Sequence, residues 1–498
     1  MTTPMEQLNK LDRQLNALGF CESLVFWDAA TLAPKNAMKG RGIALEEMSE
    51  LYYKLLINDN TKTILAQLEA NLDSLNTLDA AKFKFYQEMY SQIACIPVND
   101  YAAYSNLKTQ SSNAWEEAKE KDDFTIFQPY LQKVIDFQRQ YVAYRDLGGH
   151  PYNTLLNDYE RGLTVEVADI FFNELRAVIV PLLKKIIDKG LVIDGTFTGQ
   201  AFSLQGQKAF SDQILDKMNF NKDSGIIAES VHPFTMNITR DDVRITTAYQ
   251  ENNPLSSIYS TIHECGHALY EQNIGDYIGF SKVATGTSMG IHESQSRIFE
   301  NNVARSEAFW QAYFPMIKEI FPKQLQDATA QSCYKASNDV KTSLIRIEAD
   351  ELTYSLHIMV RYELEKAIFE GKLEAKDLPN AWKDKYEEYL GLRPDSDAVG
   401  VLQDVHWSEG LFGYFPSYAL GSAYASQFEA AMNKEFDFTL AIKEDRLSQI
   451  SDWLKEHIHQ YGSTKTPAEI ILSATGEAFN PKYFTDYLVS KYSALYDL

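Results

Sequence analysis

Proline, the residue that most strongly interrupts α-helices, is spaced so widely in this chain that long helices are expected. Two stretches, residues 35–96 and 323–378, contain no proline. Within the first stretch, apolar residues recur at three- and four-residue steps: Leu45, Met48, Tyr52 and Leu55. This period predicts a helix with one apolar face.

A second helix and one strand can be placed from their ends and their periods. The helix is predicted to begin after Thr164 and to end at Gly190, with lysines in its last turns and a kink at Pro181. The strand is predicted over residues 243–249, where β-branched residues alternate with Arg244 and polar residues. Strand signals elsewhere are sparse. The sequence therefore predicts a mainly α-helical protein with a small β-sheet.

The length and composition favour one large globular unit. The chain has 498 residues, of which 45% are hydrophobic, enough to bury an extensive core. It contains no Pro-, Gly- or Ser-rich linker and no internal repeat, so a single domain over residues 1–498 is the simplest prediction.

Charge and cysteine spacing predict a cytoplasmic protein. The net charge of −22 disfavours nucleic acid and anionic membrane surfaces as partners. The N-terminus lacks the features of a secretory signal, and no apolar run is long enough to cross a membrane. The four cysteines lie far apart, which argues against a disulfide framework: Cys21, Cys95, Cys265 and Cys333. A small residue packed inside a helix is the expected role of Cys265.

The strongest chemical signal is an H-E-x-x-H sequence from His263 to His267, within residues 258–271, which are compatible with a helix. Positions four apart stack one turn above the other on a helix, so both imidazoles can reach one ion. Glu264 lies about 100° round the helix from His263, where it can activate the attacking water instead of binding the metal.

A catalytic zinc needs a third protein ligand and one open position. We predict Glu293, at the start of a second helix after a turn-prone stretch, as this ligand. His292 is the rival, although adjacent residues diverge on a helix and a two-His, one-Glu set is the established hydrolytic arrangement. His292 is alternatively a substrate-binding residue. Glu293 is alternatively an ion-pair partner of Arg297, four residues on. One Zn²⁺ per chain is expected, with Co²⁺ as a possible substitute.

The chain resembles the carboxypeptidase Taq family of metallocarboxypeptidases over nearly its whole length. Six motifs typical of that family occur in order: His232-Pro233-Phe234, residues 242–246 (DVRIT), 263–267 (HECGH), 292–295 (HESQ), 345–350 (IRIEAD) and 400–407 (GVLQDVHW). Agreement is looser upstream, where the family usually has Met at the position of Ala33 and Pro at that of Arg161. Neither departure touches a predicted ligand.

The resemblance implies an elongated, saddle-shaped helical protein with a deep central groove and a small sheet near the metal site. It also implies a homodimer that removes single residues from the C-termini of peptides with broad specificity. Such an enzyme must recognise a terminal carboxylate, and arginine does so through charge-assisted, often bidentate hydrogen bonds.

Two arginines are candidates for the carboxylate-binding residue. Arg346 lies in one family motif, and its alternative role is an i, i+4 salt bridge to Asp350 on an exposed helix. Arg244 lies on the predicted strand, and its alternative partner is Asp242. His232 and Gln403 are predicted to help bind the same end of the substrate.

The oxyanion that develops at the scissile carbonyl requires a donor besides the metal. His406 is the predicted donor, and a tyrosine hydroxyl, from Tyr414 or Tyr418, is predicted to supply a second one. Two other functions compete with the carboxypeptidase prediction. One is a metal-dependent endo-oligopeptidase acting on short peptides, and the other is a peptide-binding protein with a decayed site.

Overall fold

The computed structural model describes residues 2–498 and divides the chain into two compact units. The first unit consists of Met1–Ile93, Asp194–Ser337 and Ala425–Ala478, and the second of Ala94–Ile193, Asn338–Tyr424 and Phe479–Leu498. Each unit is therefore assembled from three segments that are separated in the sequence. A single catalytic domain over residues 1–498 remains a prediction.

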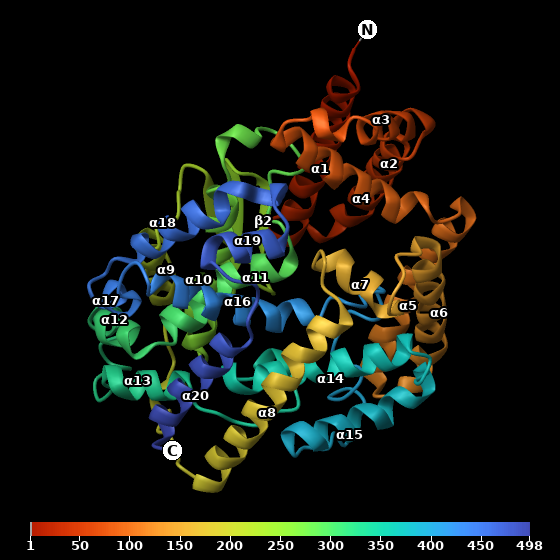
Figure 1. The fold of residues 1–498 in the computed structure, drawn as a ribbon. Helices are drawn as coiled ribbons and strands as arrows, with labels where there is room; N and C mark the ends of the chain where they lie inside the picture. The colour runs from red at the N-terminus through yellow and green to blue at the C-terminus, as the bar shows by residue number, and fades with distance from the viewer. Residues whose placement is uncertain (1) are drawn as a thin grey trace. The chain divides into compact units, whose positions relative to one another are not determined.

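The first unit contains the small sheet and most of the short helices (Figure 1). Its elements are α1 (Pro4–Thr31), α2 (Met38–Leu56), α3 (Asp59–Glu69), α4 (Thr77–Ala94), α9 (Leu204–Lys217), β1 (Gly225–Glu229), β2 (Thr235–Thr239), β3 (Asp242–Thr247), α10 (Pro254–Gln272), α11 (Met289–Arg297), the π-helix η5 (Ile298–Ala304), α12 (Glu307–Ile320), α13 (Ala330–Ser337), α17 (Phe438–Lys443), α18 (Leu447–His457) and α19 (Pro467–Thr475).

The second unit is built from long helices. Its elements are α5 (Val98–Lys121), α6 (Phe124–Arg145), α7 (Pro151–Tyr159), α8 (Val165–Lys189), the 3₁₀ turn η6 (Arg346–Glu348), α14 (Glu351–Phe369), α15 (Leu378–Leu390) and α20 (Lys482–Tyr496). Helix α16 (Pro416–Met432) contributes residues to both units. The prediction of a mainly helical protein with a small sheet is confirmed.

Helix α8 shows how closely local signals determine helix ends. Thr164 is its N-cap, and the Thr164 side chain accepts a hydrogen bond from the backbone N–H of Val167. Gly190 ends the helix in the left-handed conformation, with φ of 62°, which glycine adopts without a Cβ clash. Pro181 lies inside the helix. Both predicted ends are therefore confirmed.

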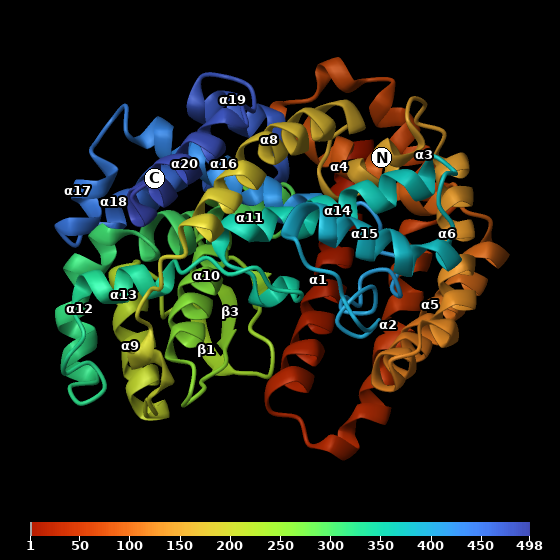
Figure 2. The ribbon, with the colours of Figure 1, turned by 90° about the horizontal axis from the view of Figure 1, so that it is seen from below.

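The sheet has three strands in the order β1-β3-β2. The central strand β3 is parallel to β1 and antiparallel to β2, with a register irregularity between Asn237 and Thr239. Val243 and Ile245 are fully buried on one face of β3, as the alternation predicts. Thr246 on the other face is also buried, and the strand ends at Thr247, two residues before the predicted end. Figure 2 shows β1 and β3 beside α10, the helix that carries the H-E-x-x-H sequence. The small sheet therefore lies beside this helix.

Within residues 2–498, no helix combines the length and apolarity needed to span a bilayer. All four cysteines are free thiols. Cys265 is fully buried within α10, as expected of a packing residue.

Candidate active site

Helix α10 positions the two histidines of the H-E-x-x-H sequence one turn apart. The helix begins at Pro254, and the N-cap Asn253 accepts a hydrogen bond from the backbone N–H of Ser256. Gly266 lies between the histidines, and a Cβ there would lie 2.4 Å from the backbone oxygen of Gln295 in α11. The absent side chain lets α11 approach α10 closely. This close packing brings Glu293 of α11 to the histidines.

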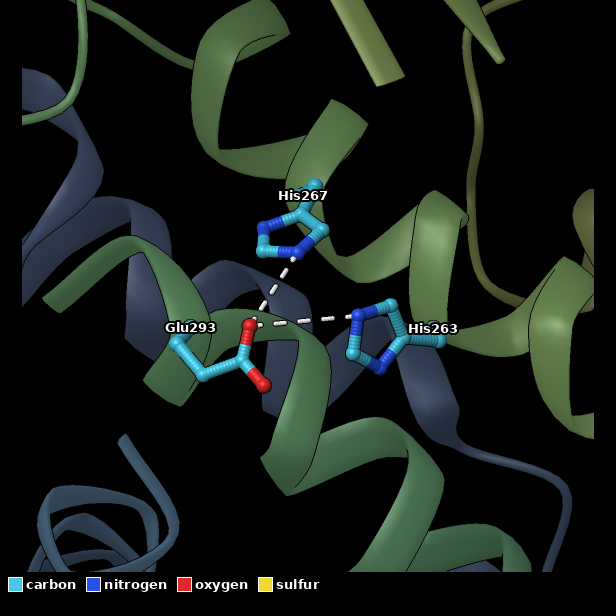
Figure 3. Close-up of side chains that lie close together, drawn as sticks. All are labelled: His263, His267 and Glu293. Carbon is cyan, nitrogen blue, oxygen red and sulfur yellow. Dashed lines mark ion pairs between the residues drawn. The ribbon is translucent and has the colours of Figure 1, made fainter. Parts of the chain in front are cut away.

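The side chains of His263, His267 and Glu293 converge on one point (Figure 3). The Oε2 atom of Glu293 lies 3.9 Å from Nε2 of His263 and 3.5 Å from Nε2 of His267. One ligand atom from each residue lies within 4.8 Å of the other two. Two imidazoles and one carboxylate match the ligand set of hydrolytic zinc sites.

The polar atoms of His263 and Glu293 that point away from the convergence point, Nδ1 and Oε1, contact neighbouring charged side chains. Nδ1 of His263 lies 2.8 Å from Oε2 of Glu300, and Nε of Arg297 donates to Oε1 of Glu293 at 2.7 Å. Arg297 also donates to Glu300 at 3.0 Å. Such outer contacts orient metal ligands and leave their inner atoms directed at the ion. The sequence left two roles open for Glu293, metal ligand and ion-pair partner of Arg297. Both are possible at once, because Oε2 faces the histidines and Oε1 faces Arg297.

The electrostatics favour the metal-binding forms of His267 and Glu293. Burial by itself lowers the pKa of His263, but the carboxylates of Glu300 and Glu293 raise it above its ordinary value. Burial lowers the pKa of His267, to about 3, which keeps the ring neutral at pH 7. Burial by itself raises the pKa of Glu293, but Arg297 and the two imidazoles lower it to about 2. Since metal ions bind neutral imidazole and ionised carboxylate, the donor set fits a divalent cation.

Glu264 is adjacent to His263 but is not one of the three converging groups. Its carboxylate is buried, and Oε2 accepts a hydrogen bond of 2.6 Å from the hydroxyl of Thr235 on β2. Burial raises the pKa of Glu264, although His263 and the Thr235 hydrogen bond oppose the shift. A carboxylate with a raised pKa is suited to accept and return a proton.

His292 lies beside the converging groups without being one of them. Its Nδ1 is 2.6 Å from Nδ1 of His267, and its Nε2 is 2.8 Å from Oε1 of Glu271. Both ring nitrogens therefore face protein atoms. The prediction that His292 binds substrate stays untested.

Two further predicted substrate-binding residues lie in the first unit. Arg244 on β3 forms a bidentate pair with Asp242, with nitrogen–oxygen distances of 2.7 and 2.8 Å, and its guanidinium lies over the ring of Trp27. The alternative partner predicted for Arg244 is thus present. His232 is exposed in the connection between β1 and β2.

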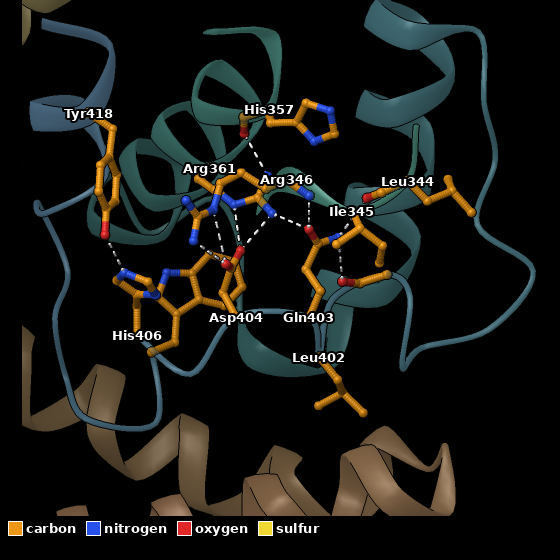
Figure 4. Close-up of polar contacts among 12 residues, drawn as sticks. Leu344, Ile345, Arg346, His357, Arg361, Leu402, Gln403, Asp404, His406 and Tyr418 are labelled. Atoms are coloured by element: carbon orange, nitrogen blue, oxygen red, sulfur yellow. Dashed lines mark hydrogen bonds and ion pairs between the residues drawn. The ribbon is translucent and has the colours of Figure 1, made fainter. Parts of the chain in front are cut away.

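The other predicted residues belong to the second unit, where Arg346 is part of a buried charge network (Figure 4). Nε and Nη2 of Arg346 donate to Oδ1 of Asp404 at 3.0 and 2.8 Å, and Nη1 donates to the hydroxyl of Tyr354. The predicted salt bridge from Arg346 to Asp350 on an exposed helix does not form. Arg346 is the buried residue of the turn η6, in which Ile347 and Glu348 are exposed, and the carboxylate of Asp350 instead caps α14.

Arg361 and Gln403 complete this network. Arg361 of α14 is fully buried and donates to Oδ2 of Asp404 and to the side-chain oxygen of Gln403. The same Gln403 oxygen accepts the backbone N–H of Arg346 at 3.0 Å. Burial by itself raises the pKa of Asp404, but the two arginines hold it well below its usual range. Asp404 therefore stays ionised between two guanidinium groups.

His406 and the two candidate tyrosines form an aromatic cluster in the same unit. Nε2 of His406 lies 3.3 Å from the hydroxyl of Tyr418, while its ring centroid lies 5.5 Å from that of Tyr414. Burial lowers the pKa of His406 to about 4, with Arg346 and Arg361 contributing. A neutral His406 can donate only one hydrogen. The contacts favour neither tyrosine as the second donor.

Several supporting residues escaped the sequence analysis. Glu271 lies four residues after His267 on α10 and Glu300 seven after Glu293, so helical spacing could have identified both. Thr235 follows the His-Pro-Phe motif directly. Arg361 gave no signal, because a lone arginine in a helix usually lies at the surface.

The chain matches known proteins along almost its full length. Residues 7–492 match the family model described as carboxypeptidase Taq (M32) metallopeptidase. Carboxypeptidase 1 of Bacillus subtilis is 42% identical, with 95% of each chain aligned, and thermostable carboxypeptidase 1 of Thermus thermophilus is 34% identical, with 99% of this chain and 98% of the relative aligned. The crystal structure of an M32 carboxypeptidase from Deinococcus radiodurans superposes with a TM-score of 0.95 at 35% identity, covering 99% of this chain and all of that one. The chain therefore belongs to the carboxypeptidase Taq family and is a metallocarboxypeptidase.

Proposed function

We propose that this metallocarboxypeptidase holds one Zn²⁺ per chain with His263, His267 and Glu293, with Co²⁺ as a functional substitute. The convergence of Nε2, Nε2 and Oε2 within 4.8 Å is the observation that carries this assignment. When bound, such an ion supplies Lewis acidity at the scissile carbonyl and lowers the pKa of water.

Glu264 acts as the general base and then as the general acid in this proposal. Its buried carboxylate takes a proton from the attacking water and returns it to the departing amine. The Thr235 hydroxyl holds one carboxylate oxygen at 2.6 Å, which restricts the rotation of the Glu264 side chain. Proton transfer thus starts from a fixed orientation.

Arg346 and Arg244 provide the positive charge that recognises the substrate's terminal carboxylate, assisted by His232 and Gln403. Arg346 has the stronger support because Asp404 and Tyr354 fix the plane of its guanidinium. A preorganised guanidinium loses little entropy on binding a carboxylate. For Arg244, a substrate carboxylate has to compete with the bidentate pair to Asp242.

His406, with Tyr414 or Tyr418, donates hydrogen bonds to the oxyanion. The neutral state of His406 supports this role, because a neutral ring keeps one N–H donor without adding charge. Broad specificity for the C-terminal residue, a homodimeric assembly and a cytoplasmic location complete the proposal. The resemblance to the family supports the first two, and the charge and the spaced free cysteines support the third.

Blocking the substrate's C-terminus tests the proposed exopeptidase activity. Paired peptides of identical sequence, one with a free carboxylate and one with a C-terminal amide, are incubated with the zinc-loaded enzyme and analysed by mass spectrometry. We expect stepwise loss of single residues from the free peptide and at least a tenfold slower reaction with the amide. Equal cleavage of both peptides at internal bonds would instead identify an endo-oligopeptidase.

A further inference from the structure

His292 lies directly behind one proposed metal ligand, and its side chain is 24% exposed. Nδ1 of His292 lies 2.6 Å from Nδ1 of His267, and Nε2 lies 2.8 Å from Oε1 of Glu271. The ring also packs against Tyr270, with 5.1 Å between ring centroids. His292 therefore bridges a histidine and a carboxylate that both belong to α10.

Both oxygens of Glu271 act as hydrogen-bond acceptors. Oε1 accepts from the backbone N–H of Gly286 at 2.9 Å and from the hydroxyl of Thr285 at 3.1 Å, and Oε2 accepts from the side-chain amide of Asn237. Glu271 is 1% exposed, so water does not supply other partners. Because both oxygens of Glu271 already accept hydrogen bonds from these donors, the hydrogen between Glu271 and His292 resides on Nε2 of His292.

The hydrogen on His292 determines where His267 carries its own. A His292 ring whose single hydrogen is on Nε2 presents a lone pair at Nδ1. Nδ1 of His267 must then donate across the 2.6 Å contact, which leaves the lone pair of His267 on Nε2. That nitrogen is the one that faces Oε2 of Glu293 at 3.5 Å. If His292 instead carried a hydrogen on Nδ1, it would donate to Nδ1 of His267. The hydrogen of the His267 ring would then lie on its Nε2.

We propose that Glu271 and His292 are positioning residues that fix His267 in the tautomer able to bind a metal through Nε2. This inference rests on the metal ligands proposed above. It gives His292 a role through His267, in place of the substrate contact expected from the sequence.

Gly286 is the position where this arrangement can be disturbed without altering any polar group. A Cβ at residue 286 would lie 2.6 Å from Cδ2 of His292 and 2.9 Å from Cε1 of Tyr270. An alanine side chain at this position must therefore displace the His292 ring. The backbone N–H of residue 286, which donates to Glu271, is retained.

The test measures Zn²⁺ affinity by competition with a chromophoric chelator. The variants are His292→Leu, which removes the acceptor for His267, His292→Gln, whose side-chain oxygen can restore it, and Gly286→Ala. His459→Gln is the matched control. His459 is a buried histidine that, like His292, packs against Tyr270. It bonds to Gln295 and Asn273 instead of a metal ligand. Thermal melting of each metal-free variant verifies folding.

We expect His292→Leu and Gly286→Ala to weaken Zn²⁺ binding about 10- to 100-fold, the usual effect of losing an outer contact of a metal ligand. His292→Gln and His459→Gln should stay within about threefold of the unaltered protein. Unchanged affinity in His292→Leu, or equal losses in the Leu and Gln variants, would overturn the proposal. If His292→Leu does not fold, Gly286→Ala decides. If His267→Ala binds Zn²⁺ as tightly as the unaltered protein, the proposed metal site itself is rejected.

Discussion

Glu264 and His263 are neighbours in the sequence, but their side chains have different hydrogen-bond partners. His263 is backed by the ionised Glu300, whereas Glu264 is backed by the hydroxyl of Thr235, which is neutral. A neutral partner stabilises the carboxylate less than a charged one, so the raised pKa produced by burial persists. In the proposed mechanism these two adjacent residues of one helix have different roles, His263 as a metal ligand and Glu264 as a proton carrier.

Replacement of Glu264 by Gln should abolish most turnover and leave metal binding intact. The amide keeps the shape of the side chain but cannot take a proton, so kcat should fall by about 10²- to 10⁴-fold. Steady-state kinetics and metal analysis of the same preparation provide the measurement. Activity close to that of the unaltered enzyme would reject Glu264 as the base.

His406 should make the stability of the protein depend on pH. Its pKa is about 4 in the folded state and near 6.5 when unfolded, so the unfolded state binds more protons between these values. The stabilising contribution is complete above pH 6.5 and is lost as the pH falls toward 4. Thermal melts between pH 4 and 8 should show a larger acid-side loss of Tm in the unaltered protein than in His406→Gln. Parallel pH curves would contradict the assignment.

Part of the proposed metal site follows from a short motif and from helix geometry, because the four-residue spacing places His263 and His267 on one face of a helix. Glu293 was predicted as the third ligand from the ligand set of hydrolytic zinc sites and from its place at the start of a second helix. The partners of Arg346 could not be predicted, since Asp404 and Arg361 are brought to it by tertiary contacts between distant segments. The alternative role for Arg346, an exposed salt bridge with Asp350, does not form for the same reason, because local spacing does not report burial.

At the scale of elements, the close contact between α10 and α11 determines whether Glu293 reaches the histidines. Gly266 allows this contact, because any side chain there would meet the backbone of Gln295 and Ser296. Backbone atoms move less readily than side-chain ends, so the two helices would have to separate. The glycine in the middle of the H-E-x-x-H sequence is thus a packing requirement of this fold.

Gly266→Ala should therefore lower both the stability and the metal affinity of the protein. Overpacking of this kind costs about 1–3 kcal/mol. Gly40→Ala, within α2, is the matched control, since a Cβ at residue 40 has no neighbour within 4 Å and alanine favours helix. Denaturant unfolding and Zn²⁺ titration provide the two measurements. Equal behaviour of the two variants would show that the helices do not depend on this contact.

At the scale of the whole molecule, metal binding should raise the melting temperature. An ion that binds only the folded state stabilises it by about 2.7 kcal/mol at one hundred times its Kd. Calorimetry of the Zn²⁺-loaded and chelator-treated protein should show an upward shift of a few degrees for the loaded form. The same comparison with His267→Ala should show no shift, and a shift of equal size there would place the stabilising ion elsewhere.

The sheet and the long helices were predictable, but the division into two interleaved units was not. Periodicity and end signals describe one element at a time, as for α8 between Thr164 and Gly190. No linker composition marks residues 94, 194, 338, 425 or 479, where the chain passes between units. Such passages depend on which apolar faces pack together, and single-element patterns do not contain that information.

The interleaved order of segments affects how a growing chain can fold on the ribosome. The loop that carries Thr285 and Gly286 is held by the hydroxyl of Ser463, which donates to both backbone carbonyls, and Ser463 belongs to the last segment of the first unit. The histidine-bearing helix therefore leaves the exit tunnel long before the residues that support its surroundings. Until translation passes residue 463, the nascent first unit keeps apolar faces uncovered, a state that chaperones recognise.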